Sequence, residues 1–165
     1  MIILAIDPGI SGALAFLDTE RAAMSALITA CDMPVLDGDV NPHQLRAIIR
    51  LKMPDLAVIE HVHSHPKEGV SSVWRFASAF TVARTVVALL EIPTMLVTPA
   101  KWKKAMSVKG GPEGKEQCRR LAIEKFPADA QLLFARKKDH GRAEAALLAV
   151  YASTLPTIRN HEAAQ

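Results

Sequence analysis

The chain opens with IILAIDPG (residues 2–9), a stretch that combines a strand pattern with a turn signal. Residues 2–6 form a short apolar run rich in isoleucine, which is typical of a buried β-strand. Asp7 ends this run, and Pro8 with Gly9 predicts a tight turn directly after it. The pattern therefore predicts a buried strand that carries a carboxylate at its end and then folds back.

Further strand and helix patterns follow this opening. Residues 12–17 and roughly 24–33 predict two more strands of an antiparallel meander. Asn41 before Pro42 is typical of a helix start, because asparagine caps the first turn and proline fits at the first helical position. This order predicts an α/β fold with a mixed five-stranded sheet and helices on both faces. The other expected elements are a helix at 42–52, strands at 55–59 and 93–98, and helices at 71–90, 99–106, 113–125 and 141–153.

The composition is that of a single globular domain. Half of the 165 residues are hydrophobic and only 5% are aromatic, so we expect a core made mainly of aliphatic side chains. Cys31 and Cys118 stand far apart, which argues against a disulfide framework and a zinc ribbon. The apolar N-terminus reaches Asp7 after six residues, too early for an export signal. We expect one domain over residues 1–153 and a flexible tail over residues 154–165.

Carboxylates stand at the ends of two predicted strands. Asp7 ends the first strand, and Glu60 directly follows the apolar run at 55–59. Ligands in open α/β sheets bind at the carboxyl ends of the strands, so both residues are candidates for a site. Two acids in close approach need a cation or a shared proton, and hard oxygen ligands suit Mg²⁺ or Mn²⁺. The alternative is that each carboxylate serves only solubility or capping.

The stretch KKDHGRAE (residues 137–144) leads into the last predicted helix and contains further ligand types. If the helix begins at His140, that residue and Glu144 are one turn apart and face the same way. Imidazole and carboxylate can then reach one metal site, whereas Asp139 points elsewhere and is a candidate N-cap. The alternative for His140 is a surface histidine that binds no metal.

Several of these segments together resemble a known family. The opening IDPGISGA (residues 6–13), the strand LAVIEHV (56–62) and the segment HGRAEA (140–145) are similar to those of the RuvC Holliday-junction resolvases, especially their phage and prophage branch. Between them, TPAKWK (98–103) and GKE (114–116) resemble the basic segment of that family. The resemblance implies an RNase H-like fold, a homodimer, and a two-metal nuclease that cuts symmetrically across a four-way DNA junction.

The resemblance also implies roles for particular residues. Asp7 would bridge two Mg²⁺ or Mn²⁺ ions, Glu60 would hold one of them, and His140 with Glu144 would complete the site. Lys115 would contact a phosphate or the transition state. Two ions about 4 Å apart activate a water molecule and stabilise the leaving oxygen of an in-line displacement at phosphorus.

Three positions depart from the pattern of the family. Family members usually place the last two ligands three residues apart, but that position here is Gly141. The nearest ligand types are His140 and Asp139, and we expect His140 because it shares a helix face with Glu144. Glutamate at 144 replaces the more usual aspartate, and His63 stands where the family often carries an aromatic residue that stacks on junction bases.

Basic residues are concentrated in the second half of the chain. Residues 101–144 contain twelve Lys and Arg against six Asp and Glu, although the whole chain carries only +3. Contacts of such residues with phosphates give affinity without sequence readout, whereas the alternative is an ordinary solvated helix surface. The residues that we expect to contact DNA are Lys101, Lys103, Lys109, Lys115, Arg119, Lys138, Arg142 and His63.

The helix expected at residues 71–90 has apolar side chains on two faces, which predicts a central helix or a subunit interface. With the resemblance, we expect branched DNA as the partner, either four-way junctions or forks, and a homodimer formed through this helix. The longest apolar stretch, residues 82–97, is too short and too interrupted to span a membrane. The expected location is the bacterial cytoplasm, or the host cytoplasm if the chain is encoded by a phage.

Other functions fit parts of the same pattern. A single-lobe phosphate-binding protein of the actin or sugar-kinase type shares the turn after the first strand, but 165 residues supply only one of the two lobes that enclose a nucleotide. RuvC-like RNA-processing nucleases usually carry an arginine that is missing from residues 7–13. A non-catalytic junction binder would not need Asp7, Glu60 and Glu144 together.

Overall fold

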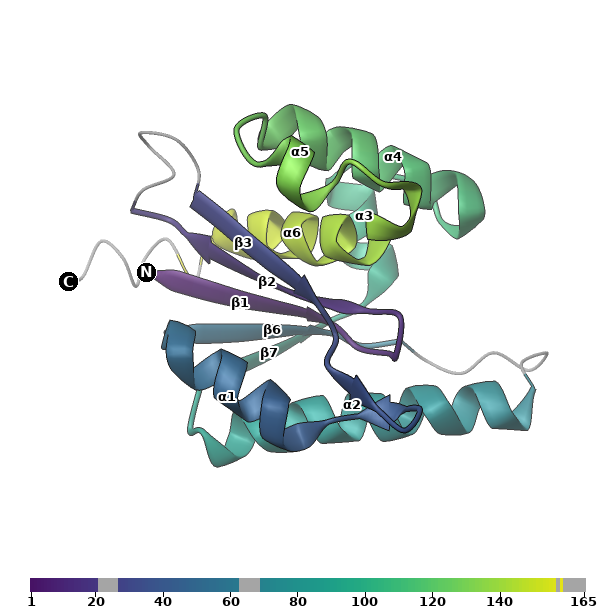
Figure 1. Cartoon of the computed structure of the whole chain (residues 1–165). Coiled ribbons are helices and arrows are strands. Elements are labelled where there is room, and N and C mark those ends of the chain that lie inside the picture. The colour runs from purple at the N-terminus through teal and green to yellow at the C-terminus, as the bar shows by residue number, and fades with distance from the viewer. Residues whose placement is uncertain (21–26, 63–68, 157, 159–165) are drawn as a thin grey trace.

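The computed structural model describes residues 1–20, 27–62, 69–156 and 158, and its centre is a five-stranded sheet (Figure 1). The spatial order of the strands is β3-β2-β1-β6-β7. The first three pair antiparallel, whereas β6 runs parallel to β1 and β7 runs parallel to β6. The predicted mixed five-stranded sheet is therefore confirmed. Its strands are β1 (Ile2–Asp7), β2 (Ala13–Asp18), β3 (Leu27–Asp32), β6 (Leu56–Glu60) and β7 (Thr94–Val97).

Helices cover both faces of this sheet, as expected (Figure 1). On one face lie α1 (Pro42–Lys52) and α2 (Val70–Leu89), which pack against each other. On the opposite face, α6 (His140–Ser153) lies directly on β1 and β2. Outside α6 lie α3 (Pro99–Ala105), α4 (Gly111–Lys125) and the short α5 (Ala130–Leu133).

Strand β1 separates two hydrophobic cores, one on each face of the sheet. Ile3 and Ala5 belong to the core beneath α6, whereas Leu4 and Ile6 belong to the core beneath α1 and α2. Successive side chains of a strand point to opposite faces, so a strand buried on both sides must be apolar throughout. This explains why the opening run contains no polar residue before Asp7.

Helix α6 lies close to the sheet because it is rich in small residues. Five of its alanines are buried, and their short side chains let the helix backbone approach β1 and β2. This contact holds the first turns of α6 above the carboxyl ends of the central strands. Beyond the helix, the side chain of Ile158 is also buried in the same core. The buried alanines are Ala143, Ala145, Ala146, Ala149 and Ala152.

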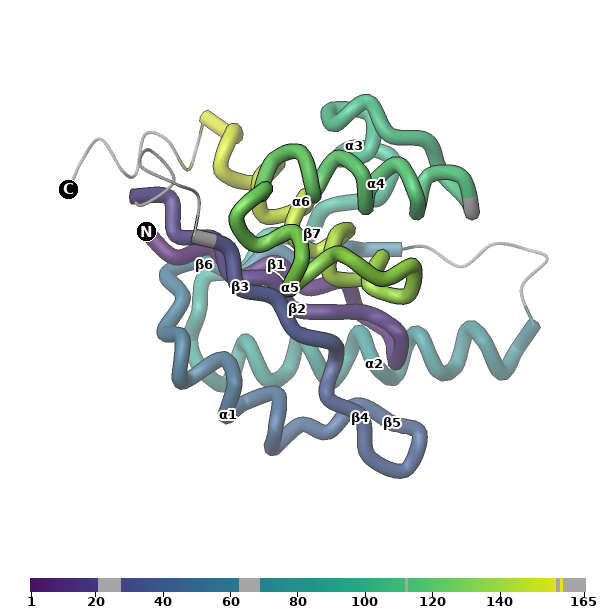
Figure 2. Tube along the Cα trace, turned by 45° about the horizontal axis from the view of Figure 1, so that its top comes forward, coloured from purple at the N-terminus to yellow at the C-terminus, as the bar shows by residue number. Residues whose placement is uncertain are grey.

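Several short elements were not predicted. A hairpin formed by β4 (Val35–Leu36) and β5 (Asp39–Val40) projects next to the start of α1 (Figure 2). Asp37 and Gly38 both have positive φ at its tip, so this Asp-Gly pair was the available signal for a tight hairpin. Helix α5 and a 3₁₀ turn, η2 (Lys137–Asp139), were also missed. Within the described residues, no helix is long and apolar enough to cross a membrane.

Candidate active site

Three carboxylates gather at the carboxyl edge of the central strands, and we call Asp7, Glu60 and Glu144 the carboxylate site. Asp7 ends β1 and Glu60 ends β6. Because these strands are parallel neighbours in register, both side chains come out at the same edge of the sheet. Glu144 comes from the start of α6, which packs over β1. Three residues that are far apart in sequence therefore share one place in the fold.

The carboxylates influence one another electrostatically. Burial raises the pKa of Asp7 well above its ordinary value, and the charges of Glu60 and Glu144 raise it further. Burial also raises the pKa of Glu60, and the charge of Glu144 adds to this effect. Lys103 opposes the shift at both residues. The arrangement concentrates negative charge where little water can solvate it, so the site favours a cation.

Close packing explains one departure from the family pattern. A Cβ atom at Gly141 would lie 2.9 Å from the backbone oxygen of Ser11, in the turn between β1 and β2. A Cβ atom at Gly12 in the same turn would lie 2.0 Å from the backbone oxygen of Asp7. Both positions therefore require glycine. Position 141 has no room for a ligand side chain, because the turn beside the carboxylate site occupies that space.

Glu60 is held by a buried tryptophan. The Trp102 indole Nε1 donates a hydrogen bond of 2.7 Å to Glu60 Oε1. Trp102 lies in α3 and is only 1% exposed, so the ring fills the core while its polar edge reaches the site. This hydrogen bond stabilises the ionised carboxylate and partly offsets the effect of burial on the pKa of Glu60. Trp102 thereby fixes the position of one member of the carboxylate site.

Glu144 is held by the next residue of α3. Lys103 Nζ lies 2.7 Å from Glu144 Oε1, and the two side chains are only 18% and 11% exposed. The same ammonium lies 5.2 Å from the centre of the Trp102 ring. Cys118 Sγ lies 4.0 Å from the same oxygen, Glu144 Oε1, and burial raises the pKa of this thiol to about 12. Cys118 is therefore an uncharged neighbour, and Lys103 supplies the positive charge.

His140 begins α6 but contacts basic residues. Its Nε2 lies 3.2 Å from Lys115 Nζ, and its Nδ1 lies 3.4 Å from the backbone oxygen of Lys137. An ammonium group only donates hydrogen bonds, so Nε2 is the acceptor and Nδ1 carries the proton. His140 lines a pocket of about 480 Å³, and we call this site the basic pocket. The residues lining it are Lys115, Glu116, Lys137, Lys138 and His140.

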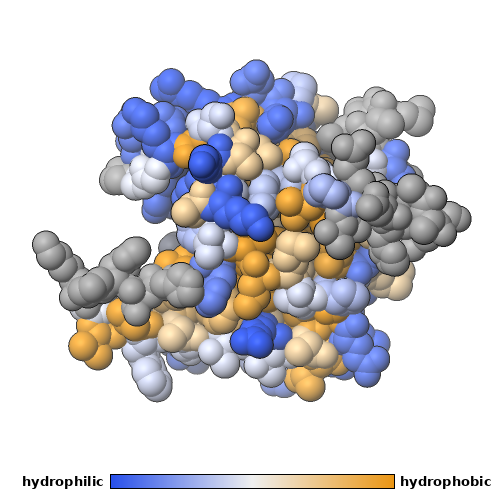
Figure 3. Space-filling view, turned by 180° about the vertical axis from the view of Figure 1, so that it is seen from behind, coloured by the Kyte–Doolittle hydropathy of each residue, from blue (hydrophilic) through white to orange (hydrophobic). Residues whose placement is uncertain are grey.

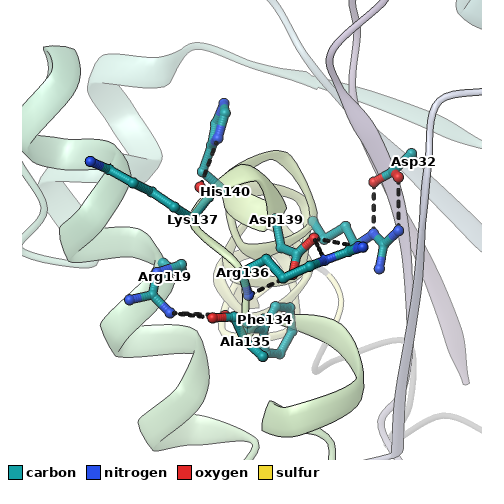
Figure 4. A network of polar contacts seen from close by, with 9 residues as sticks. Asp32, Arg119, Phe134, Ala135, Arg136, Lys137, Asp139 and His140 are labelled. Atoms are coloured by element: carbon teal, nitrogen blue, oxygen red, sulfur yellow. Dashed lines mark hydrogen bonds and ion pairs between the residues drawn. The ribbon is translucent and has the colours of Figure 1, made fainter.

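The Asp139 side chain points toward Arg136 and away from His140 (Figure 4). Its carboxylate accepts hydrogen bonds from the backbone and the guanidinium of Arg136, the shortest of 2.8 Å. Burial opposes ionisation of Asp139, but the bonds from Arg136 outweigh it and lower the pKa. Asp139 directly precedes α6, as expected of an N-cap, yet its side chain makes no capping bond to that helix. Figure 4 shows His140 and Lys137 on the other side of this segment.

Two of the arginines that we expect to contact DNA form ion pairs within the protein. Arg142 donates two hydrogen bonds of 2.7 Å to Asp32, which ties α6 to the end of β3. Arg119 pairs with Glu116 and donates a bond of 3.0 Å to the backbone oxygen of Phe134. Both side chains are therefore held by contacts within the protein. Their contact with DNA stays a prediction.

The remaining residues expected to contact DNA lie in several environments. Lys101 and Lys138 are exposed, and neither has an ion-pair partner among the residues that the structure describes. Lys109 is exposed and pairs with Glu113 at 2.9 Å. Lys103, in contrast, is turned into the carboxylate site, and His63 lies outside the described residues. Of the described members of this group, Lys103 is the one inside the carboxylate site.

The chemistry of the carboxylate site fits a hard divalent cation, since it offers three carboxylates and one direct counter-charge. In the described part of the chain, no three His, Cys, Asp or Glu side chains are yet arranged to hold a metal ion. Two of the three carboxylates are already engaged, Glu60 by Trp102 and Glu144 by Lys103. Metal binding by these residues therefore requires local side-chain rearrangement, with no change of backbone fold implied.

Sequence reasoning missed how α3 takes part in the site. From the sequence, the segment at 98–103 resembles a basic segment of the family and Lys103 is expected to contact DNA, but in the structure the side chains of Trp102 and Lys103 both bind carboxylates. The available signal was their position directly after β7, whose end lies beside Glu60 in the sheet. A short helix that starts at this edge brings its first turns close to the carboxylates.

Comparison with known proteins bears on the fold. No family model matches the sequence, and no curated protein matches it. Among solved structures, RuvC of Thermus thermophilus is similar, with a TM-score of 0.63, 16% identity, and coverage of 92% of each chain. The yeast mitochondrial Holliday junction resolvase Ydc2 has a TM-score of 0.52 and 14% identity, over 96% of this chain and 83% of that one.

A third similar structure is the fowlpox virus resolvase, solved with Holliday junction DNA. Its TM-score is 0.54 with 14% identity, over 93% of this chain and 99% of that one. At such low identities the likeness establishes a common fold. The resemblance inferred from the sequence is confirmed at that level, and this chain has the fold of the RuvC-type Holliday junction resolvases.

Proposed function

We propose that this protein is a metal-dependent endodeoxyribonuclease that resolves four-way or otherwise branched DNA junctions by paired phosphodiester hydrolysis. The observation that carries the proposal is the carboxylate site, where three acids meet at the edge of β1 and β6. This edge is where α/β folds bind ligands. The fold is shared with proteins described as Holliday junction resolvases, which supports the same class of substrate here.

Asp7, Glu60 and Glu144 would hold two Mg²⁺ or Mn²⁺ ions, and such ions would activate a water molecule and stabilise the leaving oxygen. Trp102 orients Glu60 through its indole hydrogen bond. His140 remains a candidate fourth ligand, because it precedes Glu144 by one helical turn. Its ring must leave Lys115 to bind a metal, so we expect it to contribute less than the carboxylates.

The basic pocket would bind DNA phosphates. Lys115, Lys137 and Lys138 are exposed, and the pocket also contains the imidazole of His140. Lys115 is close enough to lower the pKa of Asp7, so the two sites are neighbours. A phosphate held there would place the adjacent backbone near the carboxylate site. Junction DNA as substrate would place the enzyme in the bacterial cytoplasm, or in the host cytoplasm if a phage encodes it.

A homodimer through α2 would supply two active sites for paired cuts, since a two-fold axis relates them as it relates the arms of a junction. The first turns of α2 extend beyond the sheet (Figure 1). Seen from behind, the layer below the sheet, which contains α1 and α2, has apolar surface (Figure 3). Val70, Trp74 and Leu89 are largely exposed. Light scattering at micromolar protein should give the mass of a dimer, and a monomeric mass would contradict this assembly.

The decisive experiment compares a labelled four-way junction, a fork and a linear duplex, each with Mg²⁺, Mn²⁺ or EDTA. We expect paired nicks in the junction that require the divalent ion. Asp7→Asn should bind the same junction without cutting it. Absence of divalent-dependent cleavage of any branched substrate would overturn the nuclease proposal and favour a non-catalytic binder. Equal cleavage of the linear duplex would overturn junction selectivity. In a parallel reaction with a labelled RNA hairpin, cleavage of the RNA alone would indicate an RNA-processing nuclease.

A further inference from the structure

The Lys103 side chain occupies the carboxylate site itself. Its ammonium contacts Glu144 at 2.7 Å within a largely buried pair. Burial opposes the charge of Lys103, but Glu144 and Glu60 outweigh that effect and raise its pKa. Lys103 is therefore a cation bound to Glu144 in a place with little solvent. A solvent-exposed lysine that only contacts DNA would be neither buried nor paired with a carboxylate of the site.

The pairing is part of a larger arrangement in α3. Trp102 and Lys103 are consecutive, and each satisfies one carboxylate, Glu60 or Glu144. Burial of Trp102 anchors the short helix, so the lysine next to it starts from a fixed backbone position. Among the described residues, no buried side-chain nitrogen or oxygen lacks a hydrogen-bond partner. Two of the three carboxylates are thus paired within the protein, and the ammonium group of Lys103 is the cation that contacts Glu144.

We propose that Lys103 is the resident counter-ion of the carboxylate site and exchanges with a divalent cation, leaving Glu144 when the cation binds. This inference rests on the proposed function in that the site takes up metal. Two cations on one carboxylate repel each other strongly in a poorly solvated place, so both cannot remain. Lysine suits such an exchange because its charge sits on a long flexible stem with rotatable donors.

The exchange also leaves the ammonium group of Lys103 free to bind another anion. Once it has left Glu144, Lys103 can contact a DNA phosphate beside the site. Metal and DNA then favour each other, because the metal releases the lysine and the phosphate retains it. Lys103 acts on metal affinity through Glu144, so it is a positioning residue. A lysine with only a structural role would stabilise the folded protein but would not compete with the metal for Glu144.

The test uses Mn²⁺ alone, with binding measured by titration calorimetry on the full chain and melting temperatures measured in EDTA and in Mn²⁺. Lys103→Met should melt at a lower temperature in EDTA, bind Mn²⁺ about tenfold more tightly, and gain more from Mn²⁺ than wild type. Lys103→Arg keeps the charge and should resemble wild type. Lys104→Met is the matched control, because Lys104 is the exposed neighbour in the same helix.

Unchanged or weaker Mn²⁺ binding by Lys103→Met would overturn the inference. If that variant does not fold without metal, wild-type protein labelled with ¹³C-lysine is titrated with Mg²⁺, and the Lys103 Cε signal should shift as Mg²⁺ binds. Binding without such a shift would overturn the exchange while leaving the proposed function intact. If wild type binds neither ion and cuts no junction, both the exchange and the proposed function fail.

Discussion

The carboxylate site and the basic pocket are neighbours, yet their charges are stabilised in opposite ways. In the carboxylate site, Glu60 and Glu144 each have a protein partner, and their charges raise the pKa of Asp7. In the basic pocket, the lysines are exposed and water solvates them. Buried charges depend on one another, so a single change there propagates, whereas exposed charges act almost independently. The expected effects of mutations differ accordingly.

The largest effect should come from Asp7→Asn, which acts on activity and stability in opposite directions. Cleavage should fall by about a thousandfold, or roughly 4 kcal/mol of transition-state stabilisation, because an amide replaces the carboxylate that we propose as the shared metal ligand. Metal-free protein should become more stable at pH 7, since burial and repulsion from Glu60 and Glu144 penalise the charged form of Asp7. Cleavage rates and melting temperatures in EDTA measure the two effects.

The same reasoning fixes the pH dependence of metal-free stability. A buried acid with a raised pKa binds its proton more readily in the folded state than in the unfolded state. Its contribution to stability is present below about pH 4, the ordinary range of such acids, and is lost as the pH rises toward the pKa in the folded protein. Asp7→Asn should flatten this decline, and an unchanged pH profile of unfolding would contradict burial of a charged Asp7.

A second test removes the indole donor that holds Glu60. Trp102→Phe keeps an aromatic ring in the core but leaves the Glu60 carboxylate without its 2.7 Å hydrogen bond. We expect a loss of about 1–3 kcal/mol in the free energy of unfolding, the usual cost of a buried polar group without a partner. Burial already raises the pKa of Glu60, and losing this bond should raise it further, shifting the cleavage profile to higher pH.

Trp74→Phe is the matched control for this test. Trp74 is 75% exposed on α2, so at protein concentrations too low for the proposed dimer the same substitution should change the free energy of unfolding by less than about 0.5 kcal/mol. Urea unfolding of both variants makes the comparison. Equal losses at positions 74 and 102 would show that the indole hydrogen bond to Glu60 adds nothing to stability.

His140 and Asp139 provide the third comparison, since both are candidates for the fourth ligand. His140→Ala should reduce cleavage by about tenfold if the ring joins the metal, and should leave stability nearly unchanged. Asp139→Ala removes a carboxylate that is 2% exposed and bound by Arg136, so it should cost about 1–3 kcal/mol of stability. If His140→Ala cleaves DNA at the wild-type rate while Asp139→Ala is folded but does not cleave, Asp139 is the ligand.

These tests mark where sequence reasoning worked and where it stopped. The strand that ends in Asp7 and the one that ends in Glu60 were visible as apolar runs, because a doubly buried strand tolerates no polar interruption. The placement of both acids at one sheet edge followed from topology alone. Helical spacing likewise placed His140 and Glu144 at the start of α6. The regular spacing of side chains in strands and helices makes such positions predictable from the sequence.

The partners of these residues could not be predicted in the same way. Lys103 binds Glu144 across 41 positions of sequence, and Trp102 binds Glu60 across 42. Such interactions depend on rotamers and on the exact docking of α3, neither of which has a periodic signature. The steric need for Gly141 was equally hidden, because the conflicting atom belongs to Ser11 in a distant turn. A charged residue in the sequence therefore does not reveal whether it faces solvent or another charge.

The smallest effect should follow from the double change Lys137→Ala and Lys138→Ala in the basic pocket. Both side chains are exposed, so stability should be unaffected and junction binding should weaken. The slope of log K against log salt concentration should fall by about 0.9 for each phosphate that the variant no longer neutralises, thus by up to about 2. Cleavage at saturating DNA should stay close to wild type, because the carboxylate site is intact.

The matched control is Arg46→Ala with Arg50→Ala, two exposed cations in α1 on the opposite face of the sheet. Removing them changes the net charge by the same amount, so general electrostatic attraction falls equally in both double variants. A smaller salt slope only for the lysine variant would locate phosphate binding at the basic pocket. Equal weakening of junction binding in both double variants would mean that the lysines act through net charge alone. The basic pocket would then not be a specific phosphate-binding site.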